Sequence, residues 1–151
     1  MRRATADDGA TLVELMAEFY AESGYALDRQ HAAAAFSALL ADPALGLVWL
    51  IEHEAQVAGY VVLTFVFGME YGGPMAVIDD FFVRPAFRNA GLGTAALALV
   101  REACVAAGVR AVSVEVAADN AAAQAVYRSA GLVMTDRRLM AAPLAAPSHE
   151  V

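Results

Sequence analysis

The spacing of apolar residues predicts two helices in the first third of the chain. One helical face is formed by four apolar positions, namely Leu12, Leu15, Met16 and Phe19. We expect this helix to end near residue 21, before Gly24. Asp28 suits the cap of a second helix, which should stop at Asp42-Pro43 because the residue before a proline disfavours helix. A short strand over residues 2–5 should precede both helices.

The rest of the chain alternates between strand and helix patterns. Residues 46–52 and 57–67 are rich in β-branched and aromatic residues around a polar turn, which predicts an antiparallel hairpin. A further strand is expected over 76–83, followed by a glycine turn and a helix over 91–107. The last elements should be a strand over 111–117, a helix from Asp119-Asn120 to Gly131, and one or two strands over 132–142.

This order predicts one domain of the α/β (α+β) class with a mixed sheet. The sheet should be parallel where the helix over 91–107 crosses between two strands. We place the domain at residues 1–142 and expect residues 143–151 to form a flexible tail.

Composition and charge exclude several classes of protein. Hydrophobic residues make up 60% of the 151 positions and charged residues 18%, which excludes a disordered chain. No apolar run approaches the ~20 residues of a membrane span, and the first ten residues lack the apolar core of a signal peptide. A single cysteine, Cys104, fits a reducing cytoplasm. We therefore expect a cytoplasmic protein with no membrane partner.

The basic residues of the chain exclude two further kinds of chemistry. All ten are arginine, so a phosphate-binding loop that needs lysine and Schiff-base chemistry are both excluded. No basic patch predicts a nucleic-acid partner, and no cluster has the spacing of metal ligands. The net charge of −7 favours a cationic substrate, although it could equally serve solubility alone.

Two features between residues 76 and 99 indicate a catalytic site. Gly91 and Gly93 precede a helix, and unpaired N–H groups at a helix N-terminus favour a phosphate. Asp79 and Asp80 lie inside an apolar strand, where unpaired carboxylates are costly. The pattern from Gly91 onward also fits a dinucleotide fingerprint, with Glu115 as the ribose-binding acid. That alternative is disfavoured because residues 84–90 separate the glycines from their strand.

Two motifs resemble those of a known family. Arg88-x-x-Gly91-x-Gly93, after an Ile-Asp-Asp-Phe-Phe-Val strand, resembles motif A of the GNAT superfamily of N-acetyltransferases. Asn120-x-x-Ala123-x-x-x-Tyr127-x-x-x-Gly131 is similar to its motif B. The sequence of this strand and loop most resembles the diamine and spermidine/spermine acetyltransferase branch, which has Glu where this chain has Asp79. The family commonly has Gly at the position of Asn89, and Asn is the residue that next best tolerates a positive φ.

The resemblance implies a fold and a cofactor. The fold has a mostly antiparallel sheet of six to seven strands flanked by about four helices, with a splayed parallel pair at the cofactor site. The cofactor is acetyl-CoA, whose pantetheine arm would meet Phe81, Phe82 and Val83, with Asn120 and Ala123 beside it. The pyrophosphate would be held by a continuous loop of seven residues: Arg88, Asn89, Ala90, Gly91, Leu92, Gly93 and Thr94.

The same resemblance suggests roles for the acids and for one tyrosine. Asp79 would be the general base and Tyr127 the general acid. Strict strand alternation puts Asp79 on one face with Val77, Phe81 and Val83, and Asp80 on the other face with Ile78 and Phe82. Asp80 would contact the substrate or act as a buried partner of an arginine or of loop N–H groups. Glu22, Tyr25 and Glu70 are further candidates for the far end of the substrate.

These observations predict an N-acetyltransferase that modifies a primary amine of a small molecule, such as a polyamine, a diamine or an amino-acid-like amine. The chain could instead acetylate a protein N-terminus or an aminoglycoside. A module that binds acyl-CoA without catalysis is a further alternative. The resemblance also implies a homodimer.

Overall fold

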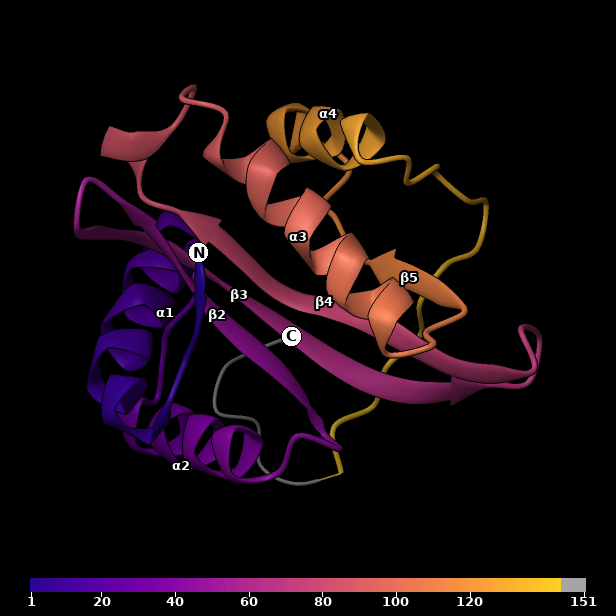
Figure 1. The fold of residues 1–151 in the computed structure, drawn as a ribbon, viewed down its shortest axis with the longest axis horizontal. Helices are drawn as coiled ribbons and strands as arrows, with labels where there is room; N and C mark the ends of the chain where they lie inside the picture. The colour runs from indigo at the N-terminus through magenta and orange to yellow at the C-terminus, as the bar shows by residue number, and fades with distance from the viewer. Residues whose placement is uncertain (145–151) are drawn as a thin grey trace.

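A computed structural model describes residues 1–144 as a five-stranded sheet between helices (Figure 1). The helices are α1 (Gly9–Ser23), α2 (Arg29–Ala41), α3 (Leu92–Ala106) and α4 (Ala121–Ser129). The strands are β1 (Arg2–Arg3), β2 (Gly46–His53), β3 (Gln56–Gly68), β4 (Gly73–Val83) and β5 (Ala111–Val114). Two single 3₁₀ turns, Ala6–Asp8 and Pro85–Phe87, precede α1 and follow β4.

The sheet has the order β1-β2-β3-β4-β5 and is mixed, as predicted. The first three pairings are antiparallel, and β4 and β5 run parallel. Helix α3 makes the connection between these two parallel strands (Figure 1). The α/β class and the mostly antiparallel sheet are therefore confirmed.

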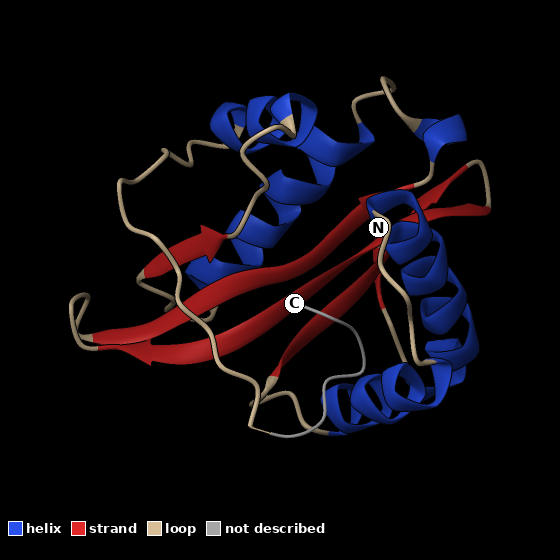
Figure 2. Cartoon of the chain, turned by 180° about the vertical axis from the view of Figure 1, so that it is seen from behind, coloured by secondary structure: helices blue, strands red, loops and turns tan. Residues whose placement is uncertain are grey.

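The expected six to seven strands are not observed, because the sheet has five. Residues 132–142 were expected to add a last strand or two, but they form no strand. This segment crosses over the strands (Figure 2), and its Arg137 pairs with Glu70, in the turn between β3 and β4, at 2.7 Å. Its apolar side chains at Val133 and Met140 stay 82% and 95% exposed. An extended apolar pattern is not enough for a strand, which also needs a neighbouring edge to pair with.

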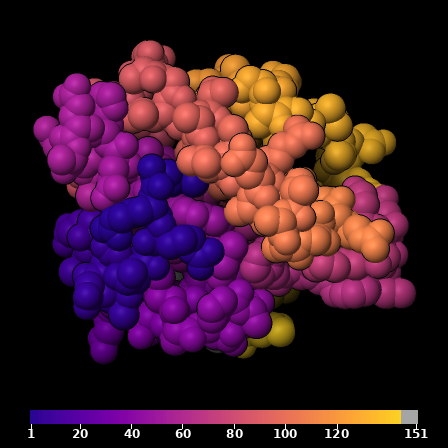
Figure 3. Space-filling view, viewed as in Figure 1, coloured from indigo at the N-terminus to yellow at the C-terminus, as the bar shows by residue number. Residues whose placement is uncertain are grey.

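The helices cover the two faces of the sheet, α1 and α2 on one face and α3 and α4 on the other (Figure 1). In the space-filling view, the indigo atoms near the N-terminus gather at the lower left and the orange atoms of α3 at the right (Figure 3). Alternate residues of β2 separate the two layers, since Val48 and Leu50 pack with α1 and α2 while Trp49 and Ile51 pack on the side of α3. The core beneath α1 and α2 is closed by three large side chains, Leu12, Leu15 and Phe36. The core beneath α3 is closed by Ala96, Leu97 and Val100.

Several predicted helix boundaries are confirmed by their caps. The side chain of Asp28 accepts hydrogen bonds from the N–H groups of Gln30 and His31 at the start of α2. Gly24 follows α1 directly. Within residues 1–144 no helix has the length and apolar character needed to cross a membrane. The predicted flexible tail, residues 143–151, lies outside the described residues except for 143 and 144.

Gly59 on β3 lies opposite Val83, at the end of β4. An added Cβ at Gly59 would meet the backbone oxygen of Phe82 at 2.1 Å, so Gly59→Ala forces the two strands apart. We expect the free energy of unfolding to fall by about 1–3 kcal/mol and the melting temperature by roughly 3–10 °C. Gly9→Ala is the control, because its Cβ meets nothing within 4 Å. Equal melting temperatures for the two variants would contradict this account of the strand contact.

Candidate functional site

The strands β4 and β5 separate halfway along β4. Their pairing runs from Met75 and Ala111 to Ile78 and Val114, where β5 ends. Residues 80–83 of β4 remain paired with β3 on the other side. The backbone of this segment therefore faces an open side, where no described strand takes its hydrogen bonds. This is the splayed parallel pair that was predicted.

A β-bulge lies at the same point of β4. On the β3 side, Val62 pairs with Asp80 and the next residue, Leu63, pairs with Ile78, so Asp79 is an extra residue in β4. Strict alternation is broken there, because Ile78 and Phe81 both pack beneath α3. The prediction that these two residues lie on opposite faces is therefore wrong. One inserted residue exchanges the faces of everything that follows it.

The bulge turns both carboxylates toward the layer of α1. The hydroxyl of Tyr60, on β3, donates a hydrogen bond of 2.7 Å to Oδ2 of Asp80. The charges of Asp79 and Asp80 both act on the phenols of Tyr60 and of Tyr20, which lies on α1. Within residues 1–144 no arginine pairs with either carboxylate. The partner of Asp80 is therefore a buried phenol.

Both carboxylates bind protons more tightly than a free aspartate does. Burial raises the pKa of Asp80 to about 6, opposed by the hydrogen bond from Tyr60 and reinforced by the charge of Asp79. Asp79 keeps an exposed surface, yet desolvation raises its pKa as well. A carboxylate with a raised pKa is a better proton acceptor near neutral pH.

Tyr127 lies across the open side of β4, on α4. Its side chain is buried, with its ring centroid 6.0 Å from that of Phe81. Burial and then the charge of Asp80 raise the pKa of Tyr127 to about 12, so its hydroxyl is protonated at neutral pH. Helix α4 begins at Asn120, whose side chain accepts a hydrogen bond from the N–H of Ala123 at 3.0 Å. Asn120 is thus an N-cap, and its amide NH₂ can still donate to a ligand.

The glycine turn before α3 forms a cradle of N–H groups. Asn89 and Gly91 have positive φ angles of 62° and 77°. Within residues 1–144, none of the N–H groups from 89 to 94 donates a hydrogen bond. Together with the dipole of α3, this arrangement fits an anionic group such as a pyrophosphate. Gly93 faces the ring of Phe81, which an added Cβ would meet at 3.5 Å.

Helix α1 is joined to the segment after β4 by two ion pairs. Glu18 pairs with Arg84 at 2.6 Å, and Glu22 pairs with Arg88 at 2.8 Å. Nε of Arg88 also donates to the backbone oxygen of Val83. Glu22, a candidate for the far end of the substrate, is therefore engaged with the arginine of the cradle.

The other two candidates lie at different distances from the carboxylates. The ring of Tyr25 lies 6.1 Å from that of Tyr20, and Tyr20 is close enough for both carboxylates to raise its pKa. Glu70 lies in the turn before β4, and Asp80 is seven residues beyond Gly73 along that strand, roughly 23 Å at the rise of a strand. The structure places Tyr25 beside Tyr20 and leaves Glu70 at the far end of the sheet.

Sequence reasoning missed Tyr60 as a site residue. It lies in the apolar run 57–67, which on its pattern alone is an ordinary buried strand. Its Cα partner on β4 is Phe82, and the contact with Asp80 is diagonal across the two strands. Only the register of β3 against β4 reveals this contact.

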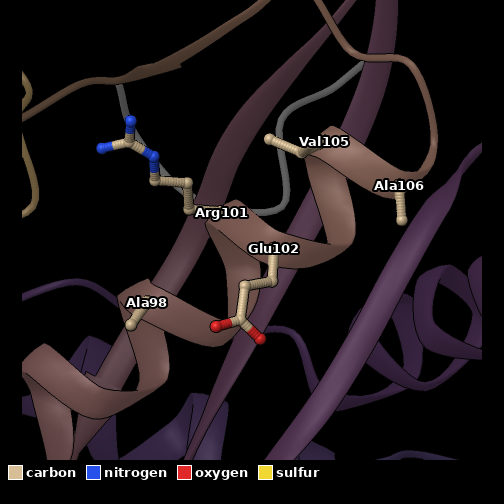
Figure 4. A pocket seen from close by; sticks show the side chains of 5 residues that line it. All are labelled: Ala98, Arg101, Glu102, Val105 and Ala106. Atoms are coloured by element: carbon tan, nitrogen blue, oxygen red, sulfur yellow. The ribbon is translucent and has the colours of Figure 1, made fainter.

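Two surface grooves lie away from Asp79, Asp80 and the anion cradle. One of about 480 Å³ runs along the outer side of α3, opposite its buried residues (Figure 4). It is lined by Ala98, Arg101, Glu102, Val105 and Ala106. A second groove of about 550 Å³ lies between α1 and α2. Neither groove includes Asp79, Asp80 or the cradle, so the chemistry of the residues identifies the site better than surface shape does. The described residues contain no group of three side chains suited to a metal ion.

Comparison with known proteins shows the family to which this fold and this anion cradle belong. The model of the acetyltransferase (GNAT) family matches residues 10–132. An integron cassette protein from the mobile metagenome of Cole Harbour Salt Marsh is 46% identical, with a TM-score of 0.88 over 97% of this chain and 91% of that chain. No curated protein matches the chain.

Two more distant structures share the fold. One, from Clostridium acetobutylicum, is described as a predicted acetyltransferase with acetyl-CoA and is 18% identical, with a TM-score of 0.80 over 93% of this chain and 94% of that chain. An aminoglycoside acetyltransferase from an uncultured soil metagenomic sample, in complex with sisomicin, is 17% identical, with a TM-score of 0.76 over 95% of this chain and 94% of that chain. Since the family model covers most of the sequence, the chain belongs to the GNAT family of acetyltransferases, enzymes that transfer an acetyl group from acetyl-CoA.

Proposed function

We propose that this acetyltransferase modifies a primary amine of a small molecule, such as a polyamine, a diamine or an amino-acid-like amine. The observation that carries the proposal is the pair of carboxylates, Asp79 and Asp80, which have raised pKa values and no arginine partner among the described residues. A cationic amine supplies the charge that this pair lacks. The net charge of −7 favours the same class of substrate.

The chain offers contacts along the whole length of acetyl-CoA, which supplies an acetyl group activated as a thioester. The cradle from Arg88 to Thr94 binds the pyrophosphate through its N–H groups. The open backbone of residues 81–83 hydrogen-bonds the pantetheine arm. The amide of Asn120, with Ala123 beside it, contacts the same arm.

Asp79 accepts the proton of the amine. An alkylamine has a pKa near ~10.4 and arrives protonated, so it cannot attack a carbonyl carbon until it loses a proton. Asp79 is the more exposed of the two carboxylates and receives this proton directly or through a water molecule. A backbone N–H of β4 beyond Ile78 stabilises the negative charge that develops on the acetyl oxygen.

Tyr127 is the proposed proton donor to the sulfur of the departing CoA. Its hydroxyl is protonated at neutral pH because its pKa is raised to about 12. A free thiol has a pKa near ~8.5, so full proton transfer from this phenol to a free thiolate is uphill. The hydroxyl of Tyr127 would therefore donate to the sulfur while the C–S bond breaks, and the proton that the nitrogen loses as the amide forms would restore the phenol. The packing of Tyr127 beside Phe81 supports that placement, since Phe81 belongs to the open segment of β4.

The far end of the acceptor meets the loop after α1. Tyr25 is 54% exposed there and presents its ring beside Tyr20. The face of an aromatic ring attracts an ammonium group, so Tyr25 could hold a second ammonium group of the acceptor. Glu22 contributes its carboxylate when Arg88 turns toward the cofactor phosphates.

An aminoglycoside is the second candidate substrate. It carries several ammonium groups, which suits the same carboxylates, and an aminoglycoside acetyltransferase shares the fold at 17% identity. We also propose that the protein is cytoplasmic and a homodimer. Cys104 is free and buried, as expected in a reducing compartment, and the exposed apolar side chains between residues 133 and 144 favour self-association.

The first experiment is thermal melting with acetyl-CoA, CoA and NAD, each alone. A ligand that binds the folded state raises the melting temperature by mass action, so only the two CoA species should shift it. A panel of polyamines, diamines, amino acids, aminoglycosides and N-terminal peptides, read out by release of free thiol, then identifies the acceptor. A shift with CoA but no turnover on any acceptor would favour a non-catalytic binding module.

Gly91→Val tests the cradle. The φ angle of 77° at Gly91 strains any larger residue, so we expect the thermal shift with CoA to disappear. Gly108→Val is the matched control, because Gly108 ends the same helix with a φ of 70° and equally open surroundings. Both variants should lose similar stability, and only Gly91→Val should lose cofactor binding. Retained affinity in Gly91→Val would remove the cradle from the cofactor site.

Tyr127→Phe tests the proton donor. The ring keeps its packing beside Phe81, so we expect acetyl-CoA still to raise the melting temperature. The kcat for the best amine should fall by roughly 10²–10⁴-fold, the usual contribution of a general acid. If kcat is unchanged, Tyr127 has no part in proton transfer.

A further inference from the structure

Tyr60 holds one of the two carboxylates from inside the core. It has no exposed surface, and its hydroxyl reaches Oδ2 of Asp80 at 2.7 Å. Its ring packs against Phe36 and Phe82, with centroids 6.1 and 6.4 Å away, so the position of the hydroxyl is set by the core. A buried donor of this kind cannot turn to water when Asp80 changes its charge.

Asp80 receives no other direct support within the described residues. Its charge acts on the phenols of Tyr60 on β3 and Tyr20 on α1, on that of Tyr127 in the core beneath α3, and on the carboxylate of Asp79 on its own strand. None of them is a cation. The hydrogen bond from Tyr60 is thus the one interaction that favours the ionised form of Asp80, against burial and the charge of Asp79.

On the basis of the proposed function, we propose that Tyr60 is a positioning residue for acetyl transfer: its hydroxyl keeps Asp80 ionised beside Asp79, so that Asp79 can take the proton of the amine. Two carboxylates this close titrate as a pair, and a charge on one increases the proton affinity of the other. Tyr60 therefore acts on the reaction through Asp80 and touches neither the amine nor the cofactor.

The test is the pH dependence of kcat/KM in the full-length protein and in Tyr60→Phe, with the best amine from the panel. Loss of the hydrogen bond raises the pKa of Asp80, because that bond favours the charged form. Activity requires ionised Asp80. We therefore expect the acidic limb of the profile, the fall of kcat/KM at low pH, to move to higher pH by about one unit. At pH values above the limb, kcat/KM should stay within about threefold of wild type, since Asp80 is ionised there in both proteins.

Phe36→Leu is the matched control. Phe36 packs against the ring of Tyr60 but is not among the groups that act on Asp80, so this variant loosens the same part of the core. We expect a lower melting temperature and an unmoved acidic limb. An equal shift of the limb in Phe36→Leu would show that packing alone is responsible and would overturn the proposal.

A second measurement does not depend on activity. Carboxyl ¹³C NMR follows the titration of Asp80 directly, and its pKa should rise in Tyr60→Phe. An unchanged pKa would overturn the proposal. A raised pKa with an unmoved acidic limb would also overturn it, while the proposed acetylation of amines would stand. Failure of the proposed function would give a different result, because the wild-type protein would then acetylate no amine at any pH.

Asp80→Asn provides a further test if Tyr60→Phe does not fold. The amide keeps an oxygen for the hydroxyl of Tyr60 and removes the charge. Asp79 then loses a charged neighbour, so the acidic limb should move to lower pH and kcat should fall about tenfold or more. Wild-type kcat and an unmoved limb in this variant would overturn the proposal.

Discussion

The extra residue at Asp79 is the constraint on which the site depends. It interrupts the ladder between β3 and β4 one residue after the pairing of β4 with β5 ends at Ile78. A bulge gives up regular ladder bonds and re-aims side chains, which is why bulges are frequent beside active sites. Here it turns two carboxylates toward α1 while Phe81 continues the core beneath α3. One five-residue segment thereby carries acidic side chains and an open backbone.

The surroundings of the carboxylates suit proton transfer better than stability. Burial of unpaired carboxylates is costly, and an arginine would relieve that cost by lowering both pKa values. Asp80 instead accepts a hydrogen bond from the phenol of Tyr60, which does not neutralise its charge. The result is a pair of acids with raised pKa values, the property that a base needs near neutral pH.

Helix α1 links the two halves of the site. Its ion pairs to Arg84 and Arg88 are partly exposed, and pairs of that kind contribute little to stability. Their effect is positional, because they tie the end of α1 to the loop that forms the anion cradle. The loop that carries Tyr25 continues from the same helix. The cradle and the loop that carries Tyr25 are therefore attached to the same helix.

The sequence by itself determined what depends on neighbouring residues: the caps of α2 and α4, the positive φ of Asn89 and Gly91, and a strand–turn–helix unit typical of the family. Only the tertiary structure decided the faces of Asp79 and Asp80 and the number of strands. Those outcomes depend on how two strands pair, and one inserted residue reverses the faces without changing the pattern of either strand. The contact of Tyr60 with Asp80 joins residues 20 positions apart, and that of Glu22 with Arg88 joins residues 66 apart. Such contacts exist only once the register and the packing of α1 are set.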